Sequence, residues 1–169
     1  MKWIGITGSW RKTNPEVEAD VRQAVRNIFQ HSNGIVTGGA LNVDSFVIDE
    51  ALTSDPTARQ IKVFIPTTLG TYSTHYRKRA QEGVILETQA ESLISLLTKL
   101  KSANPKALIE DPDNEIIDKT TYYRRNQLVV DSSDELIAFQ VNNSAGVQDT
   151  IEKARIKGIS VKKHFYTIA

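Results

Sequence analysis

Cysteine is absent from this chain of 169 residues, and histidine occurs only three times. The missing thiols exclude disulfides, thiolate metal sites and a cysteine nucleophile. The three histidines, His31, His75 and His164, show none of the close spacings that are typical of metal-binding motifs. We therefore expect no metal site.

Long hydrophobic runs and an excess of one charge are also missing. No stretch approaches the ~20 apolar residues of a membrane span, and the apolar run at Trp3–Thr7 is too short for a signal peptide. The 21 basic and 20 acidic residues leave a net charge of only +1. Any nucleic-acid-binding surface would therefore be local. We expect a cytoplasmic location and no membrane partner.

Hydrophobic residues make up 40% of the chain, which is ordinary for a globular protein of this length. We predict one domain over residues 1–169, because this length suits one core. Short apolar runs predict five strands, at residues 3–7, 34–37, 61–65, 135–139 and 159–165.

Helical periodicity separates most of these strands. Val17, Val21, Val25 and Ile28 form one apolar face, and further helices are expected near residues 43–51, 90–101, 122–130 and 147–155. Residues 75–79 indicate a short basic helix, and residues 102–118 a connecting loop. Alternating strands and helices predict an α/β fold, Rossmann-like and doubly wound, with a mainly parallel sheet of about five strands and helices on both faces.

Small residues follow three of the predicted strands, at Gly8-Ser9, at residues 37–40 and at residues 144–146. Parallel strands end at the same edge of a sheet, and ligands bind there where the strand order reverses. Glycine allows close backbone approach, and helix N-termini bind anions. Any one glycine also suits a plain tight turn, but three such turns together predict a site for a phosphate and a sugar.

The GxGxxG and GxxxxGK[ST] fingerprints are both absent, so neither a standard NAD site nor a P-loop is indicated, and we predict no cofactor.

Two polar positions extend the predicted site. Asp44, in the first turn of the second helix, either caps that helix or accepts hydrogen bonds from ribose hydroxyls. The Arg125-Asn126 pair precedes the fourth strand, and arginine matches phosphate geometry, although a surface ion pair is the ordinary alternative. The predicted ligand-binding residues are Gly8, Ser9, Gly38, Gly39, Ala40, Asp44, Arg125, Asn126, Ser144 and Gly146.

In the order of these motifs the chain resembles the SLOG superfamily, which includes the DprA/Smf and "lonely guy" (LOG) proteins. The resemblance runs from Ile4 to about Val161 and rests on the segments at residues 4–9, 36–44, 125–126 with 134–139, and 144–151. Asn42 stands where glycine is common, and Val147 where threonine is common. The resemblance implies a Rossmann-like fold, a pocket for a nucleotide, a nucleotide-derived signal or nucleic acid, and a homodimer or higher homo-oligomer.

LOG proteins are phosphoribohydrolases that cleave the N-glycosidic bond of nucleoside 5′-monophosphates. The resemblance places Asp149 at their catalytic glutamate and Arg125 at their arginine, so these two would be the catalytic residues of an enzyme. The family's P-G-G turn is missing, however, and aspartate is one methylene shorter, which matters where placement decides the chemistry. Asp149 alternatively serves as an acidic residue favoured by the helix dipole.

DprA proteins bind single-stranded DNA, and residues 75–79 and 122–125 interleave aromatic and basic side chains, as the binding of a single DNA strand requires. A solvated basic helix face explains the same pattern. We therefore predict a domain that senses or carries a nucleotide or nucleotide-derived ligand. A phosphoribohydrolase is the alternative and a single-stranded DNA binder the second alternative. The base, the phosphate count and the role of residues 76–79 stay open.

Overall fold

The computed structural model describes residues 1–169, which form six strands and six helices. The strands are β1 (Trp3–Gly8), β2 (Gly34–Gly38), β3 (Ile61–Phe64), β4 (Leu108–Ile109), β5 (Glu135–Val141) and β6 (Ser160–Tyr166). The helices are α1 (Pro15–Gln30), α2 (Val43–Ser54), α3 (Leu69–Gln81), α4 (Glu87–Ala103), α5 (Lys119–Asp131) and α6 (Ala145–Lys157).

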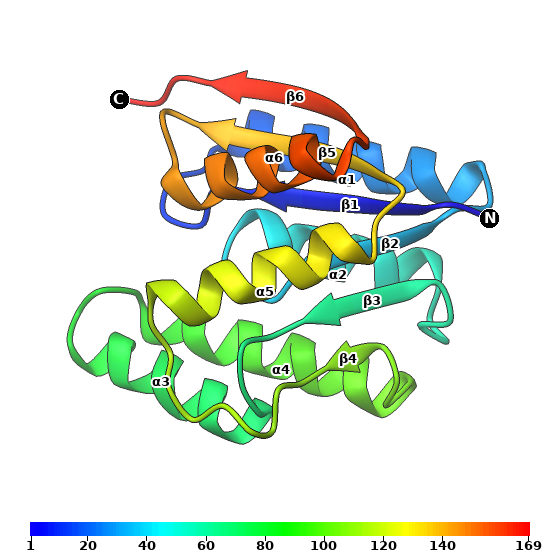
Figure 1. Ribbon diagram of the computed structural model, residues 1–169. Helices are drawn as coiled ribbons and strands as arrows, with labels where there is room; N and C mark the ends of the chain where they lie inside the picture. Colours follow the sequence, from blue (N-terminus) through cyan, green and yellow to red (C-terminus); the bar gives the residue numbers. More distant parts are fainter.

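All six strands are parallel and lie in one sheet, in the order β4-β3-β2-β1-β5-β6. The chain proceeds outward from β1 to β4 and then returns to the other side of β1 to form β5. The strand order therefore reverses between β1 and β5, whose carboxyl ends lie at the left of Figure 1. The predicted doubly wound, Rossmann-like α/β fold is confirmed, and this reversal is where such sheets bind ligands.

Helices cover both faces of the sheet, with α1, α2 and α4 on one face and α5 and α6 on the other (Figure 1). The predicted apolar face of α1 is buried in full, at Val17, Val21, Val25 and Ile28. Asn14 begins this helix because its Oδ1 accepts a hydrogen bond from the Val17 amide at 2.9 Å. Since the sheet is covered on both sides, its ligand-accessible surface is the carboxyl edge.

The sequence analysis predicts a loop at residues 102–118 and about five strands in total. The structure has a sixth, short strand within this segment. Leu108 and Ile109 form β4, which pairs with β3 at the edge of the sheet. The Val63 amide donates to the Ala107 carbonyl at 2.7 Å, and the Ile65 amide donates to the Ile109 carbonyl at 3.1 Å. A strand of two residues has no hydrophobic period of its own, so only its pairing partner identifies it.

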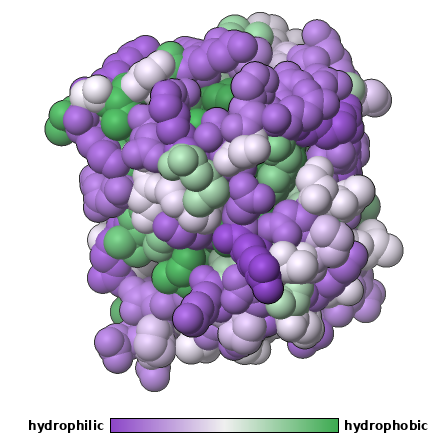
Figure 2. All heavy atoms as spheres, turned by 90° about the vertical axis from the view of Figure 1, so that its right-hand side faces the viewer, coloured by the Kyte–Doolittle hydropathy of each residue, from purple (hydrophilic) through white to green (hydrophobic).

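The face of the molecule at the opposite edge of the sheet, where the strands begin, is drawn in Figure 2. Figure 2 shows it as mainly hydrophilic, with apolar residues scattered among polar ones. None of the helices combines the length and apolar character needed to cross a lipid bilayer.

A substitution of Gly8, at the carboxyl end of β1, tests how tightly β1 and α2 pack at the edge of the sheet where the strands end. A Cβ atom at Gly8 would lie 2.3 Å from Cγ1 of the buried Val43, the first residue of α2. We expect Gly8→Ala to lower the free energy of unfolding by about 1–3 kcal/mol, because β1 and α2 must move apart. Denaturant unfolding followed by circular dichroism measures this change.

Gly70→Ala is the matched control, because a Cβ there meets no atom within 4 Å and the position is helical. We expect this change to raise the free energy of unfolding by up to about 1 kcal/mol. Equal effects of the two substitutions would contradict the steric explanation.

Candidate functional site

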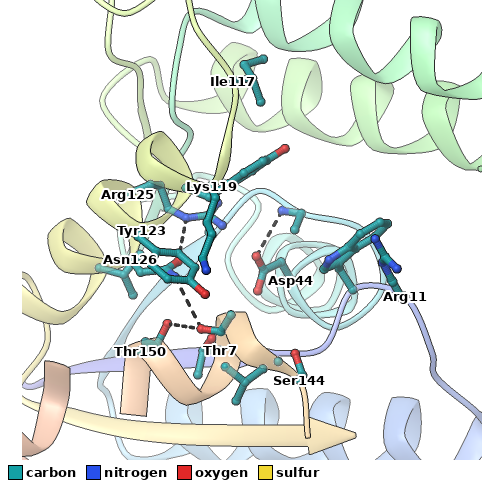
Figure 3. Close-up of a pocket in the computed structure, with 18 of the residues that line it drawn as sticks. Thr7, Arg11, Asp44, Ile117, Lys119, Tyr123, Arg125, Asn126, Ser144 and Thr150 are labelled. Carbon is teal, nitrogen blue, oxygen red and sulfur yellow. Dashed lines mark hydrogen bonds between the residues drawn. The ribbon is translucent and has the colours of Figure 1, made fainter. Parts of the chain in front are cut away.

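A cavity of about 440 Å³ opens at the carboxyl edge of the sheet, beside the point where the strand order reverses. Its walls come from the connections that follow β1, β2 and β5, together with α3, the segment after it, and α5. Figure 3 shows that Arg125, Asn126 and Lys119 come from one side, and Asp44 and Arg11 from the other. The site thus draws on segments that are far apart in the sequence.

Most of the residues predicted for ligand binding line this cavity. They are Gly8, Gly38, Ala40, Asp44, Arg125, Asn126, Ser144 and Gly146. The structure does not bring Ser9, Gly39 or Asp149 to the cavity lining, although the sequence analysis included them.

These three residues have structural contacts instead. The Ser9 hydroxyl accepts a hydrogen bond from the Val141 amide at 2.9 Å and so ties the end of β1 to β5. Gly39 is required sterically, because a Cβ there would lie 2.5 Å from Cγ2 of Ile65. The Asp149 carboxylate accepts a hydrogen bond from Asn126 Nδ2 at 3.1 Å and forms an ion pair with Lys153.

Arg125 reaches the cavity although its side chain is only 7% exposed. Its Nε donates to Oδ1 of Asn126 at 3.2 Å, and its Nη1 donates to the Phe64 carbonyl at 3.3 Å. Burial opposes the positive charge, but Tyr72 and Asp44 outweigh it and raise the pKa of Arg125. The guanidinium therefore stays charged inside the protein, with Nη2 left for a ligand.

Gly38 separates Arg125 from the buried carboxyl of Asp44. A Cβ at Gly38 would lie 2.5 Å from Nη1 of Arg125 and 2.7 Å from Oδ2 of Asp44. The two side chains thus approach the same backbone position, yet no direct ion pair joins them. Both retain the capacity to bind a third group in the cavity.

Asp44 does not cap α2, which begins after Asn42. Its Oδ2 accepts a hydrogen bond from the Ala40 amide at 3.1 Å. Its Oδ1 lies 3.2 Å from the hydroxyl oxygen of Thr37, which is also 2.9 Å from the Ile6 carbonyl oxygen and has a single proton to donate. A proton on Asp44 satisfies all of these groups, because the carboxyl then donates to Thr37 and Thr37 donates to Ile6.

The pKa of Asp44 agrees with this arrangement. Burial raises it above its ordinary value, and this effect exceeds the opposing effects of Arg125, the Ala40 amide and Thr37. The site therefore pairs a charged guanidinium with a carboxyl that readily holds a proton.

Aromatic side chains form the part of the cavity that sequence reasoning did not assign to the site. Tyr76, Tyr122, Tyr123 and Trp10 all line it. The sequence analysis considers residues 75–79 and 122–125 only as alternating aromatic and basic segments that suit the binding of single-stranded DNA. The spacing of Tyr72 and Tyr76, one helical turn apart, is the sequence signal that would have identified this wall.

Several cations of those basic segments are paired with acids. Arg77 contacts Glu91 at 2.8 Å, and Arg124 contacts Asp111 at 3.1 Å. These ion pairs lie on exposed surface, which agrees with the alternative that the basic residues of these segments form solvated helix faces.

The cavity has two chemically different ends. Thr7, Ser144 and Thr150 lie at one end in Figure 3, close to the small-residue turns that follow β1 and β5, and Ile117 lies at the other. Val84 and Ile85 add to the lining that α3 and α5 contribute. No group of three or more His, Asp or Glu side chains is placed to hold a metal ion.

This fold and site define a class, the Rossmann-like α/β proteins with a ligand cavity where the strand order reverses. No protein-family model and no curated protein matches the sequence. Among solved structures, the chain is similar to DNA processing protein A from Helicobacter pylori, whose single-stranded DNA binding mode has been described, with a TM-score of 0.71 and 20% identity.

The aligned region covers 96% of this chain and 64% of the Helicobacter protein. The protein TM1055 matches with a TM-score of 0.57 and 13% identity, over 95% of this chain and 72% of the other. DNA processing protein A from Streptococcus pneumoniae matches with a TM-score of 0.52 and 14% identity, over 95% and 58%. The chain thus spans less than two thirds of either DNA processing protein, and shares their fold, consistent with the SLOG-type fold that its motifs predict.

The raised pKa of Asp44 predicts a pH dependence of stability. The folded protein holds the Asp44 proton more tightly than the unfolded chain does, so this residue destabilises the fold increasingly as the pH rises above about 4 and through the raised pKa. We expect Asp44→Asn, which keeps both hydrogen bonds, to remove this dependence. Denaturant unfolding of both proteins across this pH range measures the difference.

Asp44→Ala is the control, because it also removes the titrating group but loses both hydrogen bonds, so we expect it to be less stable than Asp44→Asn by about 1–3 kcal/mol at every pH. A constant difference between the native protein and Asp44→Asn across the range would disprove the assignment of this titration to Asp44.

Proposed function

We propose that the cavity binds a nucleotide or a nucleotide-derived ligand. One observation carries the proposal: Arg125 and Asp44 are both buried, face one cavity and are not paired with each other. Burying a charged or polar group without a full set of partners costs free energy. A ligand that offers an anion to one residue and a hydroxyl to the other recovers that cost.

The two ends of the cavity suit the two ends of a nucleotide. Its phosphate would lie near the N-terminus of α6, where Ser144 makes no side-chain cap and Gly146 leaves open space, within the range of Arg125. Its ribose hydroxyls would contact Asp44. Its base would lie against the aromatic side chains of Tyr76 and Tyr122, and the cavity volume of about 440 Å³ falls within the usual range for such ligands.

Binding without turnover is the better-supported activity. The Asp149 carboxylate, which the phosphoribohydrolase alternative needs as a catalytic group, is engaged by Lys153 and Asn126 and lies outside the cavity lining. A carboxylate held in this way is not free to stabilise a cationic sugar or to activate water.

Single-stranded nucleic acid is a second candidate ligand, because cation and aromatic pairs stand at the cavity lining. Arg11 lies 4.8 Å from the ring centre of Trp10, and Lys119 lies 5.3 Å from that of Tyr123. Such pairs hold backbone phosphates and stacked bases. The fold is also that of a protein described as binding single-stranded DNA.

Two adjacent arginines provide the test of the proposed function. We expect Arg125→Lys to weaken the binding of nucleoside 5′-monophosphates by about tenfold or more, because lysine has a single nitrogen and cannot replace the contacts to Asn126 and Phe64 while it also donates to a phosphate. Arg124→Lys is the matched control, since Arg124 is exposed and paired with Asp111, and we expect a change below about twofold. Isothermal titration calorimetry with AMP, GMP, CMP and UMP measures both.

The same samples separate the alternatives. Release of free base and ribose 5-phosphate that is lost in Asp149→Ala would establish the hydrolase. Tight oligonucleotide binding that falls steeply with salt, without mononucleotide binding, would establish the nucleic-acid binder. Equal losses in Arg125→Lys and Arg124→Lys would contradict the proposed site.

A further inference from the structure

The loop between β1 and α1 brings a second arginine to the cavity that contains Arg125. Trp10 and Arg11 of this loop both line the cavity. In Figure 3, Arg11 lies on the side of Asp44, across the cavity from Arg125. The guanidinium of Arg11 packs 4.8 Å from the ring centre of Trp10, and Arg11 takes part in none of the ion pairs of the protein.

This loop is held on two sides. The Ser9 hydroxyl accepts a hydrogen bond from the Val141 amide at 2.9 Å, so the loop begins against β5. The side-chain amide of Asn42, immediately before α2, donates to the Trp10 carbonyl. Because β1 and β5 are neighbours in the sheet and β5 leads into α6, the loop that carries Arg11 lies beside the N-terminus of α6.

Asn42 adopts a backbone conformation that usually requires glycine. Its φ of 62° and ψ of −110° lie outside the regions that residues with a side chain favour. Glycine would fit this backbone better, but it would leave the Trp10 carbonyl without the Asn42 amide. The chain thus accepts local strain at the residue that fixes the loop.

Positive charge exceeds negative charge in the cavity lining, although the net charge of the chain is only +1. The basic residues of the lining are Arg11, Arg79, Lys119 and Arg125, and its acidic residues are Asp44 and Asp118. Of the four cations, Arg79 has an acidic partner, Glu82 at 3.5 Å, and the other three have none. One phosphate group carries at most about two negative charges at neutral pH. The lining therefore has more positive charge than a single phosphate needs.

We propose that Arg11 binds a second phosphate, so that the site prefers a nucleoside diphosphate or triphosphate to a monophosphate. The inference rests on the proposed function, in which the first phosphate lies near the N-terminus of α6 and Arg125. Since the loop lies beside that N-terminus, a phosphate linked directly to the first is within the range of Arg11. A guanidinium packed on an aromatic ring keeps its N–H groups in a fixed plane that suits phosphate oxygens.

Nucleotides that differ only in the number of phosphates test this preference. The base that binds best among AMP, GMP, CMP and UMP is compared as its mono-, di- and triphosphate, by calorimetric titration of the full chain without divalent cations. We expect the diphosphate to bind about fivefold or more tightly than the monophosphate, which is the gain that one charge-assisted hydrogen bond supplies.

Arg11→Ala tests the cause of the preference, and Lys12→Ala is its matched control. Each change removes one positive charge from the same exposed loop, but Lys12 does not line the cavity. We expect Arg11→Ala to weaken diphosphate binding more than monophosphate binding, so that the ratio of the two affinities falls to about twofold or less. We expect Lys12→Ala to keep the native ratio. Equal falls in both variants would show an effect of overall charge and would overturn the role of Arg11.

Asn42→Gly separates the position of the loop from the stability of the fold. Relief of the positive φ offsets the lost hydrogen bond to Trp10, so we expect a free energy of unfolding close to that of the native protein. The preference for the diphosphate is nevertheless expected to fall by about half or more, because the loop that carries Arg11 is released. A native ratio in Asn42→Gly would overturn the positioning role of Asn42.

The remaining outcomes distinguish this inference from the proposed function. Equal affinities for the monophosphate and the diphosphate would overturn the second phosphate site and leave the proposed function standing. A gain through Arg11 for a 5′-phosphorylated dinucleotide, without a gain for the diphosphate, would assign Arg11 to a nucleic-acid strand and overturn the inference. Failure of every mono-, di- and triphosphate to bind the native protein would overturn both.

Discussion

The carboxyl end of β2 has no room for side chains, and the site depends on this constraint. At Gly38, the backbone separates the guanidinium of Arg125 from the carboxyl of Asp44, and a single methyl group would collide with both. At Gly39, the same constraint comes from Ile65, which follows the neighbouring strand, and the buried carbonyl accepts a hydrogen bond from the Tyr72 hydroxyl. Two adjacent glycines thus bring a cation, an acid and an oriented hydroxyl to one strand end.

These groups influence one another because they share a buried environment. Removal from water raises the pKa of Asp44, and the nearby guanidinium opposes that change only in part. Once Asp44 has lost its proton, its negative charge in turn favours the charged form of Arg125, which burial disfavours. A low local dielectric strengthens each of these interactions and also makes unpaired groups costly. The proposed ligand would offer each of these groups a further hydrogen-bonding partner.

The structure also explains why some predicted site residues have other contacts. Ser9, Gly39 and Asp149 stand beside residues that line the cavity, and sequence position alone does not distinguish the two groups. Ser9 bonds to the backbone of β5, a strand more than a hundred residues away in the sequence. Asp149 lies one turn into α6, where its direction depends on the helix that packs alongside, because α5 supplies Asn126. Such contacts follow from the packing of elements that are distant in the sequence.

The order of strands and helices, the three small-residue turns and the parallel sheet could be predicted from the sequence, because hydrophobic period and glycine position are local properties. The strand β4 could not be predicted in this way, because a strand of two residues is defined by the β3 backbone beside it. That Tyr76 lines the site, next to the buried Tyr72, also depends on tertiary contacts, since the Gly39 carbonyl that accepts from Tyr72 lies on a different segment of the chain. Burial and hydrogen-bond direction are properties of neighbours in space, and these neighbours assemble only when the sheet has formed.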